Sequence, residues 1–235
     1  EKRAGPTPAS VEMVPATGRR AVNDIVAEAF SFAVDTSTVT ESRAVPVGPE
    51  QLTAKVAVAD IFADSAKDAA APHGDAAIAL QFDASDPASV EAMVEKTVAH
   101  FGRLDILNNN AAMTDPVTSQ QDTDAVTLPL EIWDEIIDVN LRGYLLGCKY
   151  AIPLMISGGG GSIINTASVA GLGGGGGPQA YSAAKAAVIN LTETTANELA
   201  AHLIRVNAIC PGIIFTPLIH RGDEADAETV MSELQ

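Results

Sequence analysis

The chain has 235 residues and is acidic, with 30 Asp and Glu residues against 14 Lys and Arg residues and a net charge of −16. This charge repels nucleic-acid backbones and anionic lipid surfaces, so we expect neither partner. The length is enough for a substantial core, and we expect one domain over residues 1–235. No apolar run reaches the roughly 20 residues that span a bilayer, and no signal-peptide core follows Glu1, which favours a cytoplasmic protein.

The cysteines and histidines give no sign of a disulfide or a metal centre. Cys148 and Cys210 both lie in apolar patterns, and we expect them to be reduced and buried. The four histidines are scattered without metal-ligand spacing, so we expect no metal site. They are His73, His100, His202 and His220.

The first fifty-odd residues are atypical. Residues 11–18 could form a first strand, although Pro15 is poorly suited to a central strand, and residues 21–30 could form the helix that follows. Residues 31–53, which are rich in Ser, Thr, Val and Pro, then separate this helix from the next regular element.

A regular alternation of predicted strands and helices begins at Lys55. The patterns predict strands over residues 55–60, 76–82 and 104–107, and a helix between Asp86, which can cap it, and Gly102, which can end it. In the second half we expect a long helix over residues 131–156, a strand over 161–168, a helix from Tyr181 through Leu203, and a strand over 205–210. Strands that alternate with helices indicate an α/β fold with a parallel sheet.

Tyr181 and Lys185 are the most informative pair. Four residues apart on a helix, they lie on the same face, so the ammonium can approach the phenol oxygen. A nearby cation favours the phenolate and makes the tyrosine usable as a general acid or base. On its own the spacing also fits a packed tyrosine beside a solvated lysine.

Other motifs accompany this pair in a fixed order. Asn109 and Asn110 follow an apolar run, Asn140 lies in a long helical pattern, Ser168 ends a buried strand, and Pro211-Gly212 precedes Thr216. With these five motifs, residues 55–218 resemble the short-chain dehydrogenase/reductase family. The resemblance implies a Rossmann-like doubly wound parallel sheet flanked by helices in a single domain.

The resemblance also implies roles for individual residues. Tyr181 would be the catalytic base, Lys185 would lower its pKa and bind the nicotinamide ribose, Ser168 would donate to the substrate oxygen, and Asn140 would support a proton relay through water. The implied cofactor-binding residues are Gly18, Asp60, Ile61, Asp83, Ala84, Asn110, Tyr181, Lys185, Ile214 and Thr216.

Asp60 favours NAD over NADP. A carboxylate at the end of the second strand can accept hydrogen bonds from the adenosine ribose diol and repel a 2′-phosphate, and no Arg or Lys follows it directly. A solvated acid at a strand end is the alternative. Asp35 is a rival nearer the usual spacing from Gly18, but regular elements follow Asp60 at ordinary intervals.

Two regions depart from the family pattern. Only Thr17-Gly18 remains of the glycine-rich turn that cradles the cofactor pyrophosphate, and side chains such as Arg19 and Arg20 would obstruct close approach. After an acidic tail over residues 220–235, which suits a lid, the family normally continues with another helix and a last strand. We therefore expect a fragment, or a partner that completes the edge of the sheet.

The resemblance implies an oxidoreductase that transfers a hydride between NAD(H) and a secondary alcohol or ketone. The glycine run at residues 173–177 suits a substrate loop, and family habit implies a homo-oligomer, a tetramer or a dimer. The alternative is a non-catalytic nucleotide-binding or structural scaffold of the same fold. The altered glycine turn favours the scaffold, whereas the coexistence of Asn140, Ser168, Tyr181 and Lys185 favours the enzyme.

Overall fold

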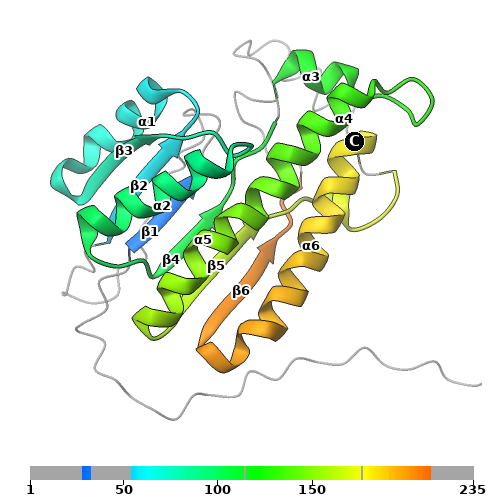
Figure 1. Cartoon of the computed structure of the whole chain (residues 1–235). Helices are drawn as coiled ribbons and strands as arrows, with labels where there is room; N and C mark the ends of the chain where they lie inside the picture. The colour runs from blue at the N-terminus through cyan, green and yellow to red at the C-terminus, as the bar shows by residue number, and fades with distance from the viewer. Residues whose placement is uncertain (1–27, 33–53, 114, 176, 213–235) are drawn as a thin grey trace, which may run out of the picture.

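The computed structural model describes residues 28–32, 54–113, 115–175 and 177–212. In this part of the chain six parallel strands form one sheet in the order β3-β2-β1-β4-β5-β6 (Figure 1). The strands are β1 (Glu28–Phe32), β2 (Lys55–Asp60), β3 (Ala77–Gln81), β4 (Ile106–Asn109), β5 (Gly161–Thr166) and β6 (Ile204–Ile209). The strand order reverses between β1 and β4, as in a doubly wound α/β fold.

Helices cover both faces of this sheet. The longer ones are α1 (Ala63–Ala70), α2 (Pro87–Phe101), α4 (Leu130–Ile137), α5 (Gly143–Gly158) and α6 (Gln179–Leu199), and the shorter ones are η3 (Ala71–Ala76), α3 (Pro116–Gln121), η4 (Asp138–Arg142), η5 (Val169–Gly171) and η6 (Ala200–His202). α2, α5 and α6 lie side by side over one face (Figure 1). α1 lies on the other face, because Ala66 and Ala70 pack on Val58, whereas Ala57 and Ala59 belong to the core beneath α2 and α5.

The sequence predicted α2 accurately. Asp86 accepts a hydrogen bond from the Ala88 backbone N–H at 3.0 Å, and Pro87 takes the first helical position, where a missing N–H costs nothing. Val90, Met93 and Val94 are buried on one face of the helix. Gly102 ends α2 in the left-handed region at φ 91°, where residues with a side chain are strained.

Three expectations were wrong in detail. Residues 28–30 belong to β1 rather than to a helix over 21–30, because this segment pairs with both β2 and β4. β4 begins and ends two residues later than expected, since Asn109 is buried and pairs across the sheet with Asn165 of β5. Cys210 is only partly buried, whereas Cys148 is buried as expected, and both are free thiols. The proposed first strand over residues 11–18 lies outside the described residues.

The long helix expected over residues 131–156 is continuous but not uniform. A wide turn, η4, joins α4 to α5 and carries Asn140, so the helix widens where the motif asparagine lies. α5 ends at Gly158 and β5 begins at Gly161, so Gly159 and Gly160 form the connection between them.

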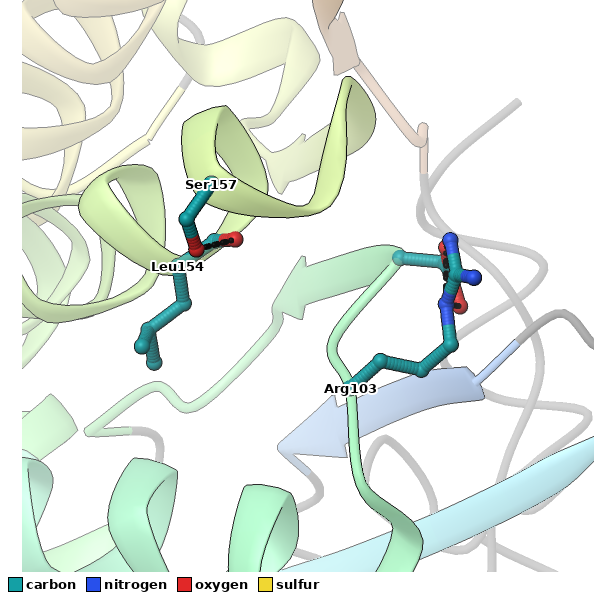
Figure 2. A network of polar contacts seen from close by, with 4 residues as sticks. Arg103, Leu154 and Ser157 are labelled. Atoms are coloured by element: carbon teal, nitrogen blue, oxygen red, sulfur yellow. Dashed lines mark hydrogen bonds and ion pairs between the residues drawn. The ribbon is translucent and has the colours of Figure 1, made fainter.

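Short local contacts lie near the edge of the sheet at which the strands begin. Arg103 pairs with Asp105 just before β4, and the Ser157 hydroxyl donates to the Leu154 carbonyl oxygen near the end of α5 (Figure 2). The backbone oxygen of Asp105 also accepts from Ser162 N–H at 2.8 Å, which ties the starts of β4 and β5 together. Across the described ranges, no helix has the length and apolar character needed to cross a membrane.

Candidate active site

The residues expected at the site gather at the carboxyl edge of the sheet. Because the strands are parallel, the segments that follow each strand emerge at the same edge, and the strand order reverses between β1 and β4, the position at which doubly wound folds bind their ligands. The strand arrows in Figure 1 point towards the end of the molecule that carries α3 and the start of α6. The predicted residues that end or follow strands at this edge are Asp60 and Ile61 (β2), Asp83 and Ala84 (β3), Asn110 (β4) and Ser168 (β5).

Lys185 lies at the centre of this arrangement. It is on α6, one turn after Tyr181, and only 1% of it is exposed. Its Nζ donates to the Thr166 carbonyl oxygen at 2.7 Å and to the Tyr144 hydroxyl oxygen at 3.2 Å. The same atom lies 5.7 Å from the centre of the Tyr181 ring. The ammonium and the Tyr181 ring are therefore neighbours on one face of α6.

Burial lowers the pKa of Lys185 from its ordinary value of 10.5 to about 8. The cause is desolvation, which disfavours the charged ammonium inside the protein. In the described part of the chain no carboxylate forms an ion pair with Lys185. The ammonium is held by neutral oxygens, so its charge is available to an anion that forms beside it.

Ser168 caps a short turn that packs on α6. Its Oγ accepts from the Ala170 backbone N–H at 3.2 Å, and the residue is 8% exposed. Because that bond uses a lone pair, the hydroxyl proton of Ser168 remains available for another acceptor. Gly171 lets this turn approach α6 closely, since a Cβ there would lie 2.6 Å from the carbonyl carbon of Lys185.

Asn140 is fully buried in the wide turn η4, which packs against α6. Its Oδ1 accepts from the Met113 backbone N–H at 2.6 Å, which links the turn to the segment after β4. Its Nδ2 is buried and has no hydrogen-bond partner among the described residues. A buried amide donor of this kind can bind a water or a ligand atom.

Some of the expected cofactor-binding residues lie in the described part of the chain, and others lie outside it. Asp60 is buried and its Oδ1 accepts from the Phe62 backbone N–H at 2.8 Å, while Ile61 is 45% exposed beside it. Asp83 is half-buried and its Oδ1 accepts from the backbone and hydroxyl of Ser85 at 2.8 Å and 2.7 Å. Ala84 is buried, and Asn110 is half-buried at the end of β4. Gly18, Ile214 and Thr216 lie outside the described residues, as do Asp35 and the tail.

Asp122 is a residue of the site that the sequence did not reveal. Its carboxylate accepts from the Ala180 backbone N–H at 2.8 Å and from the Tyr181 backbone N–H at 2.9 Å, and the residue is 6% exposed. It therefore caps α6 at the turn that carries Tyr181. No local pattern could have found it, because it lies almost sixty residues before the helix it caps.

A buried polar ladder beneath the site was also missed. Asn109 Nδ2 donates to Asn165 Oδ1 at 2.8 Å, Asn165 Nδ2 donates to the Thr192 hydroxyl at 2.9 Å, and that hydroxyl donates to the Val188 carbonyl oxygen at 2.7 Å. The ladder joins β4, β5 and α6. The sequence motif Asn109-Asn110 was recognised, but the residues that bind Asn109 in the folded chain could not be predicted from it.

Comparison with known proteins identifies the family. The model of the short chain dehydrogenase family matches residues 50–227, which is most of the chain. The chain belongs to the short-chain dehydrogenase family. The match includes all four residues expected to be catalytic, and the Rossmann-like parallel sheet agrees with it.

Several curated members of this family are similar to the chain. A 2-(R)-hydroxypropyl-CoM dehydrogenase of Xanthobacter autotrophicus is 37% identical over 70% of the chain and 66% of its own length. The 3-oxoacyl-acyl-carrier-protein reductase FabG of Thermotoga maritima is 40% identical over 64% and 58%, and the cyclohexanol dehydrogenase of an Acinetobacter strain is 37% identical over 73% and 67%. The chain therefore spans about two thirds or less of the length of these relatives.

Proposed function

We propose that this short-chain dehydrogenase is an NAD-dependent oxidoreductase that interconverts a secondary alcohol and a ketone. One observation carries the proposal. A buried Lys185, held by neutral oxygens, lies one helical turn from Tyr181 and beside the strand that leads to Ser168. This arrangement favours a phenolate at Tyr181 over a neutral phenol, because the phenolate would balance the buried ammonium charge.

The proton chemistry belongs to the side chains. In the oxidation direction, Tyr181 accepts the hydroxyl proton of the substrate as the carbinol carbon loses a hydride. Ser168 donates its hydroxyl proton in a hydrogen bond to the substrate oxygen, whose charge develops during the step. Lys185 stabilises the phenolate, and the buried Nδ2 of Asn140 binds water on the path by which the proton leaves.

The residues at the carboxyl edge suit a nicotinamide dinucleotide. When bound, the nicotinamide supplies the hydride acceptor for oxidation or the hydride donor for reduction. Ile61 offers an exposed apolar side chain for the adenine, and Asp60 offers a carboxylate for the ribose diol, which favours NAD over NADP. Asp83, Ala84 and Asn110 line the same edge, and we also assign Gly18, Ile214 and Thr216 to the cofactor.

Relatives guide the substrate class. The names of the similar enzymes include a cyclohexanol dehydrogenase and a cis-4-hydroxycyclohexanecarboxylate dehydrogenase, both of which denote alcohols on a ring. A secondary alcohol or cyclic ketone is therefore the first class to test. We further propose that the protein is cytoplasmic and forms a homo-oligomer, a tetramer or a dimer. The exposed apolar side chains of Leu145 and Ile156 on α5 support an interface between copies.

The test combines cofactor binding with turnover. Titration with NADH and with NADPH, followed by nicotinamide fluorescence, should show saturable binding with NADH preferred, and a panel of cyclic secondary alcohols should show turnover. Tyr181→Phe should keep cofactor binding and lose about 10²-fold or more in kcat, because the proton acceptor is gone. Retained turnover in Tyr181→Phe would refute the assignment, and a protein that binds neither cofactor would fit the non-catalytic scaffold.

A further inference from the structure

The hydroxyl of Tyr144 forms a closed triangle with the catalytic lysine. Tyr144 is the second residue of α5, and its hydroxyl donates to the Thr166 carbonyl oxygen at 3.1 Å. Lys185 Nζ donates to that same carbonyl oxygen at 2.7 Å and to the Tyr144 hydroxyl oxygen at 3.2 Å. Three separate elements, α5, β5 and α6, thus meet at one ammonium group.

Tyr144 is well suited to hold a cation without titrating. It is 1% exposed, and burial raises the pKa of its phenol well above the ordinary value, so the group stays neutral. Its hydroxyl is both donor and acceptor, so one group can accept from Lys185 and donate to Thr166. Lys185 Nζ also lies 4.9 Å from the centre of the Tyr144 ring, within the range of a cation–π contact.

We propose that Tyr144 is a positioning residue: its hydroxyl holds the Lys185 ammonium against the Thr166 carbonyl oxygen, so that the charge lies beside Tyr181. An ammonium has three N–H donors, and Tyr144 and Thr166 fix two of them. Because the ammonium is tetrahedral, fixing two of its N–H groups also fixes the direction of the third. Without the hydroxyl the ammonium would keep one fixed partner, lose a dipole that stabilises its charge, and rotate more freely.

The surroundings of Lys185 allow this contribution to be measured. The titratable groups that face it are Tyr181 on its own helix α6 and Tyr144 on α5, while β5 presents the Thr166 carbonyl oxygen. Cys210, after β6, packs in the same apolar cluster as Tyr144. Among the described residues no carboxylate pairs with Lys185 that could mask the effect of one hydroxyl.

The inference rests on the proposed function for its catalytic meaning, but its first test does not require turnover. In protein labelled with ¹³C at the lysine ε-carbons, the six lysines give few resonances, and loss of one in Lys185→Met assigns Lys185. In Tyr144→Phe, which keeps the ring and removes the hydroxyl, the pKa of Lys185 should fall by about one pH unit. Tyr150→Phe removes a hydroxyl from the same helix and should leave that pKa unchanged.

The second test uses turnover. If the proposed function holds, Tyr144→Phe should move the acidic limb of the kcat profile to higher pH, because a less stable ammonium favours the Tyr181 phenolate less. KM should change little. A Lys185 pKa in Tyr144→Phe equal to that in Tyr150→Phe would overturn the inference whether or not the protein turns over an alcohol. If Tyr144→Phe folds poorly, fluorotyrosine at position 144 weakens the oxygen as an acceptor, and it should lower the Lys185 pKa by a smaller amount.

Discussion

Lys185 shows how a single buried residue can reduce the stability of the fold. The ammonium is buried among neutral oxygens, and its pKa is lowered to about 8 by desolvation. A charged group in such a place costs folding free energy, which the fold must supply from its core. A residue selected only for stability at this position would be apolar.

This cost predicts a specific pH dependence. Between about pH 8 and the unfolded value of 10.5, the unfolded chain binds more protons at Lys185 than the folded chain, so the free energy of unfolding should rise with pH. Relative to Lys185→Met, the wild-type protein should gain roughly 2 kcal/mol between about pH 7 and about pH 9.5, measured by urea unfolding. Lys149→Met, which removes an exposed lysine from α5, should show no such difference. A constant gap between wild type and Lys185→Met would contradict the lowered pKa.

The residues of the candidate site differ in how far the sequence could predict them. Tyr181 and Lys185 were found because a helix places residues four apart on one face, and the order of the motifs supplied Ser168 and Asn140. Tyr144 could also have been found, since it lies one turn after Asn140. Asp122 could not, because only the folded chain brings its carboxylate to the start of α6.

At the scale of elements, α6 is the part of the fold on which the site depends most. Its first turn carries Tyr181, its second carries Lys185, and its buried face contacts β5, β6, η4 and η5. Pro178, the residue before the helix, has no side chain that can accept from the free N–H groups. Asp122 supplies that acceptor from the segment after α3, and so couples the position of Tyr181 to the part of the chain that faces the site.

Removal of this cap should therefore affect activity more than stability alone would explain. Asp122→Ala leaves one buried and one partly buried N–H group without an acceptor and should lower the free energy of unfolding by about 2 kcal/mol. It should also lower kcat roughly tenfold, because Tyr181 is no longer held in place. Both quantities are measured on one preparation, by urea unfolding and by steady-state turnover.

Gly102→Ala is the matched control for this variant. A side chain at φ 91° costs about 1–2 kcal/mol, and the site lies at the other end of the strands. Its kcat should equal that of the wild type at temperatures where both proteins are folded. Equal kcat values in Asp122→Ala and Gly102→Ala would mean that Asp122 only stabilises the helix.

The limits of element prediction have physical causes. α2 was predicted to the residue because its cap, proline and terminal glycine act locally. The strand boundaries were less accurate, because pairing with neighbours decides where a strand ends, and Asn109 is kept in β4 by its partner Asn165. β1 was missed for the same reason, since its five residues become a strand between β2 and β4 rather than through any pattern of their own.

At the scale of the whole molecule, topology assembles the site. The alternation of strands and helices predicted a parallel sheet, and a parallel sheet brings the ends of β2, β3, β4 and β5 to one edge. Residues separated by more than a hundred positions, from Asp60 to Lys185, therefore meet at the same side of the molecule. The sequence could predict this because it requires only the order of elements, not their exact packing.

The overall charge is the other property of the whole chain, and it also affects stability. The chain has a net charge of −16, and its acidic groups repel one another more strongly in the compact state than in the unfolded chain. Salt shortens the range of this repulsion, from about 30 Å at 0.01 M to about 10 Å at 0.1 M. Raising NaCl from about 10 mM to about 200 mM should therefore raise the thermal midpoint by about 2–4 °C, which corresponds to about 1 kcal/mol for a chain of this size.

The salt effect should depend on pH if charge repulsion is its cause. Lowering the pH from about 8 towards about 5.5 reduces the net negative charge by protonating histidines and the more basic carboxyl groups, and the gain in thermal midpoint should shrink with it. Differential scanning calorimetry at the two pH values measures both gains. An equal rise at both would point to a general effect of salt on apolar burial, and a fall at about pH 8 would mean that favourable ion pairs outweigh the repulsion. We do not expect the fall, because the ion pairs seen among the described residues lie at least partly in solvent, where each contributes at most about 1 kcal/mol.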